Sequence, residues 1–325
     1  MKANKKTLLG TSLLLITAIL WGTTFIAQKM GSDYVKPFTY NFYRNAISAV
    51  ILFLIYFIKM LIIRNKEKKE NLDNQESLDK KSCDKTCDKR LKKYIVVVMI
   101  LVGVSLFLGQ SFQQIGITLT HSAAKAGFIS STYLIFVPII GIFIFKKKVN
   151  IGVWICLFIA LAGSFIISIK DGFTIEVGDL VTLLCAIAFA FQIIFVDEVS
   201  DKVDPILVSG IQFIIASSLS FICKVIFEGF DLEGLKKATY AILYAAVFSG
   251  CIAFTLQIVG QKYAPATIAS VTMSSECVFT LIASMIILGE KLTLLEWIGS
   301  GLIMLSIILV QIEFKKNKEI VEETQ

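Results

Sequence analysis

One carboxylic acid lies deep inside a long apolar stretch of the sequence. Glu276 is ten residues past Ala266, where that stretch begins, so a helix would place it about 15 Å deep, near the middle of a roughly 30 Å hydrocarbon layer. Thr272 and Thr280 stand four residues to either side and share its helix face. We expect this face to point into a helix bundle, where Glu276 either pairs with the amine of a solute or exchanges a proton. The alternative is a structural carboxyl bonded to a neighbouring helix.

A second apolar stretch carries a polar stripe at helical spacing. Asn41, Arg44, Asn45 and Ser48 lie at i, i+3, i+4 and i+7, which gathers them on one face. Arg44 could attract a carboxylate or take part in gating. It could also be a structural arginine that extends to lipid headgroups or bonds carbonyls, since helical rise puts it only about 9 Å from the outer end of the stretch.

Uncharged amides form a third group. Gln110, Gln113 and Gln114 cluster at i, i+3 and i+4, and Gln257 occupies the position of Gln114 in a later, similar segment. These amides could bind a polar solute without a fixed charge, or they could join helices by hydrogen bonds. We expect the only histidine, His121, to lie on a loop surface rather than in a proton relay.

Aromatic residues accompany these polar groups. Trp21 and Phe25 are four residues apart, and the corresponding later region contains Phe189 and Gln192. Aromatic walls would suit apolar or aromatic solutes, and ordinary packing against lipid or helices is the alternative.

The elements that carry these residues are predicted to cross a bilayer. The chain has 325 residues, of which 56% are hydrophobic and 18% charged, with a mean hydropathy of +0.76. Apolar runs of about 20 residues recur without strand-like alternation, which indicates helices and not barrel strands. We therefore predict an all-α integral membrane protein with ten transmembrane helices. The predicted spans are 8–28, 38–58, 94–114, 126–145, 151–170, 178–196, 205–225, 239–259, 266–288 and 294–314.

Basic residues between the spans predict the orientation. With a cytoplasmic N-terminus, 23 Lys and Arg lie inside and seven outside, so the positive-inside rule places both termini in the cytoplasm of a multi-pass cell-membrane protein. Orientation also accounts for the net charge of +7, so we expect no nucleic-acid partner. The charged residues 64–93 are predicted to form a flexible solvated loop, with contact to anionic lipid headgroups as a further option.

The chain also resembles itself. A shift of 168 positions places Ser32, Asp33 and Pro37 on identical residues, and a shift of 143 does the same for Ser131 and Trp154. The difference between the shifts reflects the long charged loop 59–93 of the first half. Residues 1–170 and 171–325 are thus predicted to be two five-helix repeats, and an odd number of helices makes the second repeat inverted.

Several short strings give the chain a resemblance to a known family. They are ILWGTTF at 19–25, Arg44, AGF at 126–128, YLIFVP at 133–138 and LGEKL at 288–292. Their order and spacing on ten helices resemble the drug/metabolite transporter superfamily, EamA type. The resemblance implies a membrane carrier with a central cavity lined mainly by spans 1, 3, 4, 6, 8 and 9, which often exports amino acids or other metabolites, and it adds Tyr133 and Ser130 as cavity residues. Members with this glutamate often follow it with Pro, and Cys277 here puts a proline-dependent bend in doubt.

The function predicted from the sequence is secondary transport, as an exporter of small amphiphilic metabolites such as amino acids by alternating access. An uptake carrier for a metabolite or sugar-type solute is the alternative. A membrane enzyme for lipid-linked substrates would need a nucleophile with a base or a metal cluster, and the sequence offers neither. No phosphate-binding loop is present, no cofactor is expected, and Cys83 and Cys87 lack further metal ligands. The expected partners are a small-molecule substrate and membrane lipids, with proton coupling through Glu276 as one option.

Overall fold

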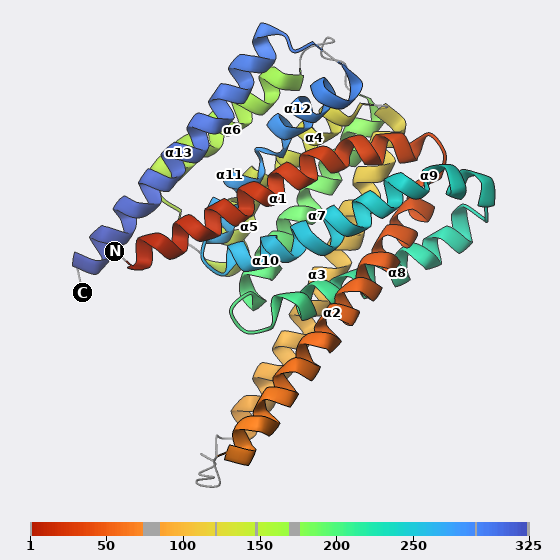
Figure 1. Ribbon diagram of the computed structural model, residues 1–325. Helices are drawn as coiled ribbons and strands as arrows, with labels where there is room; N and C mark the ends of the chain where they lie inside the picture. The colour runs from red at the N-terminus through yellow and green to blue at the C-terminus, as the bar shows by residue number, and fades with distance from the viewer. Residues whose placement is uncertain are drawn as a thin grey trace.

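The chain folds into a bundle of helices (Figure 1). The computed structural model describes residues 2–73, 85–120, 122–146, 149–168, 176–289 and 291–323. His121, Cys83 and Glu290 lie outside the described residues. The elements are α1 (Lys2–Ser32), α2 (Pro37–Asp73), α3 (Lys85–Thr120), α4 (Ala123–Ser131), α5 (Tyr133–Phe145), α6 (Ile151–Ser168), α7 (Val177–Val199), α8 (Pro205–Phe227), α9 (Leu232–Tyr244), the π-helical segment η2 (Ala245–Ala253), α10 (Phe254–Gln261), α11 (Ala266–Met273), α12 (Glu276–Leu288) and α13 (Leu294–Glu323).

The predicted membrane class is confirmed, with one difference in the spans. Among the described residues, nine helical stretches are long and apolar enough to cross a membrane. The predicted span 151–170 coincides with a shorter apolar helix, Ile151–Ile167. Many large apolar side chains face outward, as lipid-facing helices require, and Phe143 is 80% exposed.

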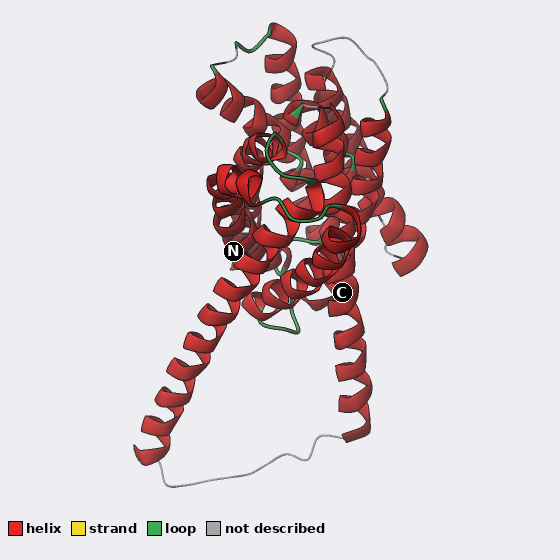
Figure 2. Ribbon diagram, turned by 90° about the vertical axis from the view of Figure 1, so that its right-hand side faces the viewer, coloured by secondary structure: helices red, strands yellow, loops and turns green. Residues whose placement is uncertain are grey.

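The helix α1 runs through the bundle and packs against α12, α10 and η2 (Figure 1). The helix α3 packs against α7 and α8, and α13 packs against α6. Small residues allow close approach: a Cβ atom at Gly163 of α6 would lie 2.6 Å from the Gly299 carbonyl oxygen of α13. The start of α1 and the end of α13 lie near each other, on the side from which α2 and α3 extend (Figures 1 and 2).

The prediction of a flexible loop over residues 64–93 is wrong at both ends. The helix α2 continues to Asp73 and α3 begins at Lys85, so both project beyond the bundle as helical arms (Figure 2). Residues 74–84 lie outside the described part of the chain. Lys and Glu have high helix propensity, and extending an existing helix avoids the cost of nucleation, which explains the longer helices.

Two predicted spans are interrupted at corresponding places. The span 126–145 breaks at Thr132 between α4 and α5, and the span 266–288 breaks at Ser274 and Ser275 between α11 and α12. The hydroxyls of Thr132, Ser274 and Ser275 each donate to the carbonyl three residues earlier, at 2.7 Å. Such bonds compete with the helical ladder and tighten the turn. The helix is therefore interrupted directly before Glu276 although no Pro follows this residue, and the hydroxyl bonds of Ser274 and Ser275 accompany the interruption.

Candidate functional site

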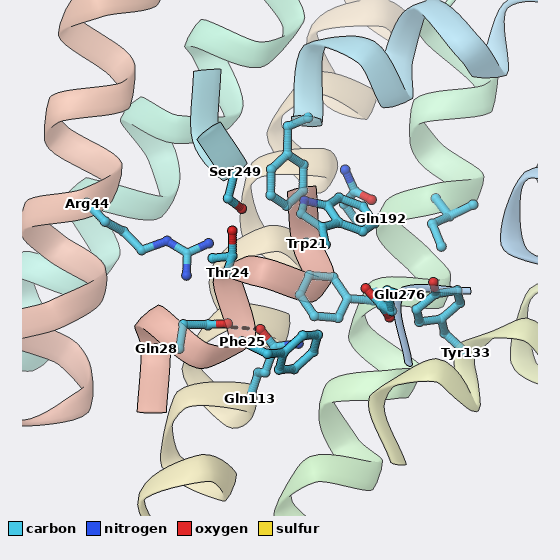
Figure 3. Close-up of a pocket in the computed structure, with 13 residues that line it drawn as sticks. Trp21, Thr24, Phe25, Gln28, Arg44, Gln113, Tyr133, Gln192, Ser249 and Glu276 are labelled. Atoms are coloured by element: carbon cyan, nitrogen blue, oxygen red, sulfur yellow. Dashed lines mark hydrogen bonds between the residues drawn. The ribbon is translucent and has the colours of Figure 1, made fainter. Parts of the chain in front are cut away.

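A cavity lies between the helices of the bundle (Figure 3). The walls come from α1, α2, α3, α5, α7, η2, α10 and α12, and the lining residues are Trp21, Thr24, Phe25, Gln28, Arg44, Gln113, Tyr133, Phe189, Gln192, Ile193, Ser249, Phe254 and Glu276.

Arg44 supplies a buried positive charge at one end of the cavity. Its side chain extends from α2 towards Thr24 of α1 and Ser249 of η2 (Figure 3). The residue is 3% exposed, and neither its Nε nor its Nη1 atom has a hydrogen-bond partner among the described residues. No described carboxylate lies within 4.0 Å of it. An unpaired guanidinium in such a place is costly, so it is a candidate for binding an anionic group of a solute.

The register between α2 and η2 positions this end. Ser48, one turn after Arg44, donates its hydroxyl to the Ala246 carbonyl at 2.9 Å. Gly250 leaves room for that hydroxyl, because a Cβ atom there would collide with it. π-helical turns are rare and often mark functional sites. Here the π-helical segment brings Ser249 to the cavity beside Arg44.

Glu276 supplies an acidic group at the other end. It is the first residue of α12, directly after the Ser274 and Ser275 break, and it is 3% exposed. Tyr133, the first residue of α5, lies beside it (Figure 3). Each helix break thus delivers a polar side chain to the cavity. Broken helices at corresponding places are a known way to build a transport site.

Aromatic rings form the apolar wall between the two ends. The rings of Trp21 and Phe254 are 4.9 Å apart at an angle of 57°, and Phe213 meets Phe254 edge-on from behind at 5.4 Å. The Trp21 Nε1 atom has no hydrogen-bond partner among the described residues. The wall can therefore contact an apolar group and still offer one donor.

The predicted site residues divide into two groups. Five of them line the cavity, namely Trp21, Arg44, Gln113, Tyr133 and Glu276. Five others, Gln110, Gln114, Gln257, Ser130 and Thr272, are buried outside the lining.

The second group makes hydrogen bonds within the protein. Gln110 accepts from Asn45 at 2.7 Å, and Gln257 donates to Gln192 at 3.0 Å. Gln114 donates to the backbone of Gln28, and Thr272 donates to the Ile268 carbonyl. Ser130 accepts from Gln113 at 3.3 Å. Gln110, Gln114 and Gln257 thus make the interhelical bonds that the sequence left open for the amides, whereas the Thr272 bond stays within α11.

Some lining residues were not identified from the sequence. Gln28 lies at i+7 from Trp21, so extending the Trp21 and Phe25 face by one turn would have found it. Its amide donates to Gln113 at 3.1 Å (Figure 3). Ser249 and Phe254 had no such signal, because the π-helical turns change which face meets the cavity.

The lining pairs residues from corresponding positions of the two halves. The shift of 168 relates Trp21 to Phe189, Thr24 to Gln192 and Phe25 to Ile193, and the shift of 143 relates Tyr133 to Glu276. Equivalent surfaces of both halves therefore meet at the cavity. Arg44 corresponds to Gln212, which lies outside the lining, so only the first half contributes a positive charge to the cavity.

Comparison with known proteins accounts for this two-part arrangement. Two curated relatives are similar over most of their length. An uncharacterized transporter of Archaeoglobus fulgidus is 28% identical, and the match covers 92% of this chain and 84% of the relative. The uncharacterized transporter YoaV of Bacillus subtilis is 24% identical, and the match covers 96% of this chain and 99% of the relative. A protein of known crystal structure has the same fold, with a TM-score of 0.68 and 17% identity over 94% of this chain and 97% of its own. The EamA-like transporter family matches residues 8–169 and again residues 176–312, and the chain belongs to this family of membrane transporters.

Proposed function

We propose that the protein is a secondary transporter that exports small amphiphilic metabolites such as amino acids by alternating access. The observation that carries this proposal is the buried cavity with an unpaired guanidinium at one end, a carboxyl group at the other and aromatic rings between them. Charged groups so deep in a membrane bundle are costly unless they serve a solute or an ion. A small solute with both charged and apolar parts satisfies all three surfaces.

Alternating access is supported by close helix contacts near both ends of the bundle. A Cβ atom at Gly10, near the start of α1, would lie 2.9 Å from the Gly260 carbonyl oxygen of α10. One at Gly178, near the start of α7, would lie 2.6 Å from Thr120 at the end of α3. We infer that these contacts close the cavity in turn as the two repeats rock against each other, with the second repeat inverted and both termini cytoplasmic.

Transport by the purified protein in liposomes tests the proposal. Vesicles loaded with unlabelled amino acid should accumulate the same labelled amino acid by counterflow, and protein-free vesicles should not. Glu276→Gln should reduce this exchange, whereas Glu233→Gln, an exposed residue near the start of α9, should leave it unchanged. Efflux from preloaded cells then tests the direction. The proposal fails if no amphiphilic metabolite from a broad panel is exchanged above the protein-free control.

A further inference from the structure

The two charged groups of the cavity lie on different sides of α1 (Figure 3). Arg44 lies beside Thr24, and Glu276 lies beyond Trp21 and Phe25 (Figure 3). Thr24 and Phe25 are neighbours in sequence, so their side chains leave the helix about 100° apart. Phe25 lies near the acidic end of the cavity. Its ring would be 4.0 Å from a Cβ atom at Gly127, and the Gly127 carbonyl accepts a bond from Cys277, the residue after Glu276. Helix α1 thus places an aromatic surface between the charges.

Each end is equipped for one kind of charge. At the Arg44 end, the guanidinium group, whose Nε and Nη1 atoms have no partner among the described residues, can donate hydrogen bonds to a carboxylate. At the Glu276 end, the carboxyl group can accept from an ammonium group, and the Tyr133 hydroxyl lies beside it. Among the described residues, Arg44 and Glu276 form no ion pair with each other within 4.0 Å. A solute that satisfies both must reach from one end to the other.

This requirement separates two classes of amino acid. In an α-amino acid the nitrogen and the carboxylate carbon share one carbon atom and are about 2.5 Å apart. In a chain such as 6-aminohexanoate the same groups stand at the two ends of an apolar stem, roughly 7 Å apart when extended. The stem would lie against Trp21, Phe25 and Phe254, and each charge would find its partner.

We propose that the cavity selects dipolar solutes with a terminal carboxylate at Arg44, a terminal ammonium at Glu276 and an apolar stem between them, in preference to α-amino acids. This inference rests on the proposed transport function and specifies its substrate class. α-Amino acids leave one of the two buried groups unpaired, and an unsatisfied buried group weakens binding.

Two isomers provide the test. 6-Aminohexanoate and norleucine have the same atoms and the same net charge, and they differ only in the spacing of the charged groups. Binding to the purified wild-type protein is measured by thermal stabilisation in detergent, and transport by counterflow in liposomes. We expect 6-aminohexanoate to bind at least tenfold more tightly than norleucine.

Variants assign each end. Hexylamine lacks the carboxylate, so Arg44→Gln should make its affinity equal to that of 6-aminohexanoate. Hexanoate lacks the ammonium, so Glu276→Gln should make hexanoate and 6-aminohexanoate equal. The exposed Glu233→Gln variant should keep the wild-type order. The isomer comparison uses the wild-type protein, so it decides the question even where a variant does not fold.

The outcomes separate this inference from the proposed function. Norleucine binding as tightly as 6-aminohexanoate would overturn the selection of separated charges and leave amino-acid transport standing. Absence of 6-aminohexanoate binding would also overturn the inference. If, in addition, no amphiphilic metabolite is transported, the proposed function falls as well.

Discussion

The contact between α1 and α12 beside the cavity gives a quantitative prediction. A Cβ atom at Gly22 would lie 2.6 Å from Phe279 Cβ and 2.8 Å from the Thr280 nitrogen. Ordinary contact begins at 3.4 Å, so Gly22→Ala requires about 0.8 Å of separation, the difference between the two distances. Backbone atoms of α12 block the site and cannot rotate away. We expect a destabilisation of about 1–3 kcal/mol, as for other overpacked sites.

The same shift should impair transport, because Trp21 precedes Gly22 and Glu276 is one turn from Phe279. Displacing cavity groups by close to 1 Å should lower the transport rate by on the order of tenfold. Gly301→Ala is the matched control: Gly301 is exposed on α13 with nothing within 4 Å of its Cβ position, and alanine favours the helix by up to about 1 kcal/mol. Thermal unfolding in detergent and counterflow measure both effects. An unfolding temperature of Gly22→Ala equal to that of Gly301→Ala would refute the close packing of α1 on α12.

Three further predictions concern the acidic group, the helix break and the orientation. Glu276→Gln keeps the shape but removes titration, so transport should fall at least tenfold or lose its dependence on a pH gradient, and an unchanged rate, affinity and pH profile would contradict a role for the carboxyl. Replacing Ser274 and Ser275 together by alanine removes two hydroxyl-to-carbonyl bonds at the break, so transport should decrease with little loss of folded protein. The control Ser12→Ala removes a similar bond on the exposed face of α1 and should transport normally. Equal effects of the two changes would contradict a role of the helix break in transport. An impermeant thiol reagent should label a variant with Cys83 as its single cysteine only after cells are permeabilised, and strong labelling of intact cells would reverse the orientation.

The charged cavity residues could be predicted from the sequence because charge is rare in apolar spans. Glu276 lies near the centre of its predicted span, so it was expected to face the interior of the bundle, whereas for Arg44 the sequence left contact with lipid headgroups open. The amides were ambiguous for a physical reason. A buried glutamine makes the same hydrogen bonds to a neighbouring helix as to a solute, and only the structure separates Gln113, which lines the cavity, from Gln110, which joins two helices.

The interruptions of the helices were harder to predict. Proline is the familiar signal for a bend, and the hydroxyl pair Ser274 and Ser275 is weaker because serine is common in uninterrupted membrane helices. The π-helical segment Ala245–Ala253 has no sequence signal that we can name, although it decides that Ser249 reaches the cavity. The extent of α2 and α3 was underestimated for another reason, since the charged residues 64–73 suit both a solvated loop and a solvated helix.

The two halves have similar helices but contribute different residues to the cavity. Both halves break a span at the corresponding hydroxyl residues, Thr132 and Ser275, so both present the next side chain to the cavity. Tyr133 occupies that place in one half and Glu276 in the other. These two residues lie side by side at the acidic end of the cavity (Figure 3), so the difference between the ends comes from Arg44, whose counterpart Gln212 lies outside the lining. The polarity therefore comes from the few positions at which the halves differ, and Arg44 and Glu276 are the positions at which a substitution should change which solutes bind without changing the helices that hold them.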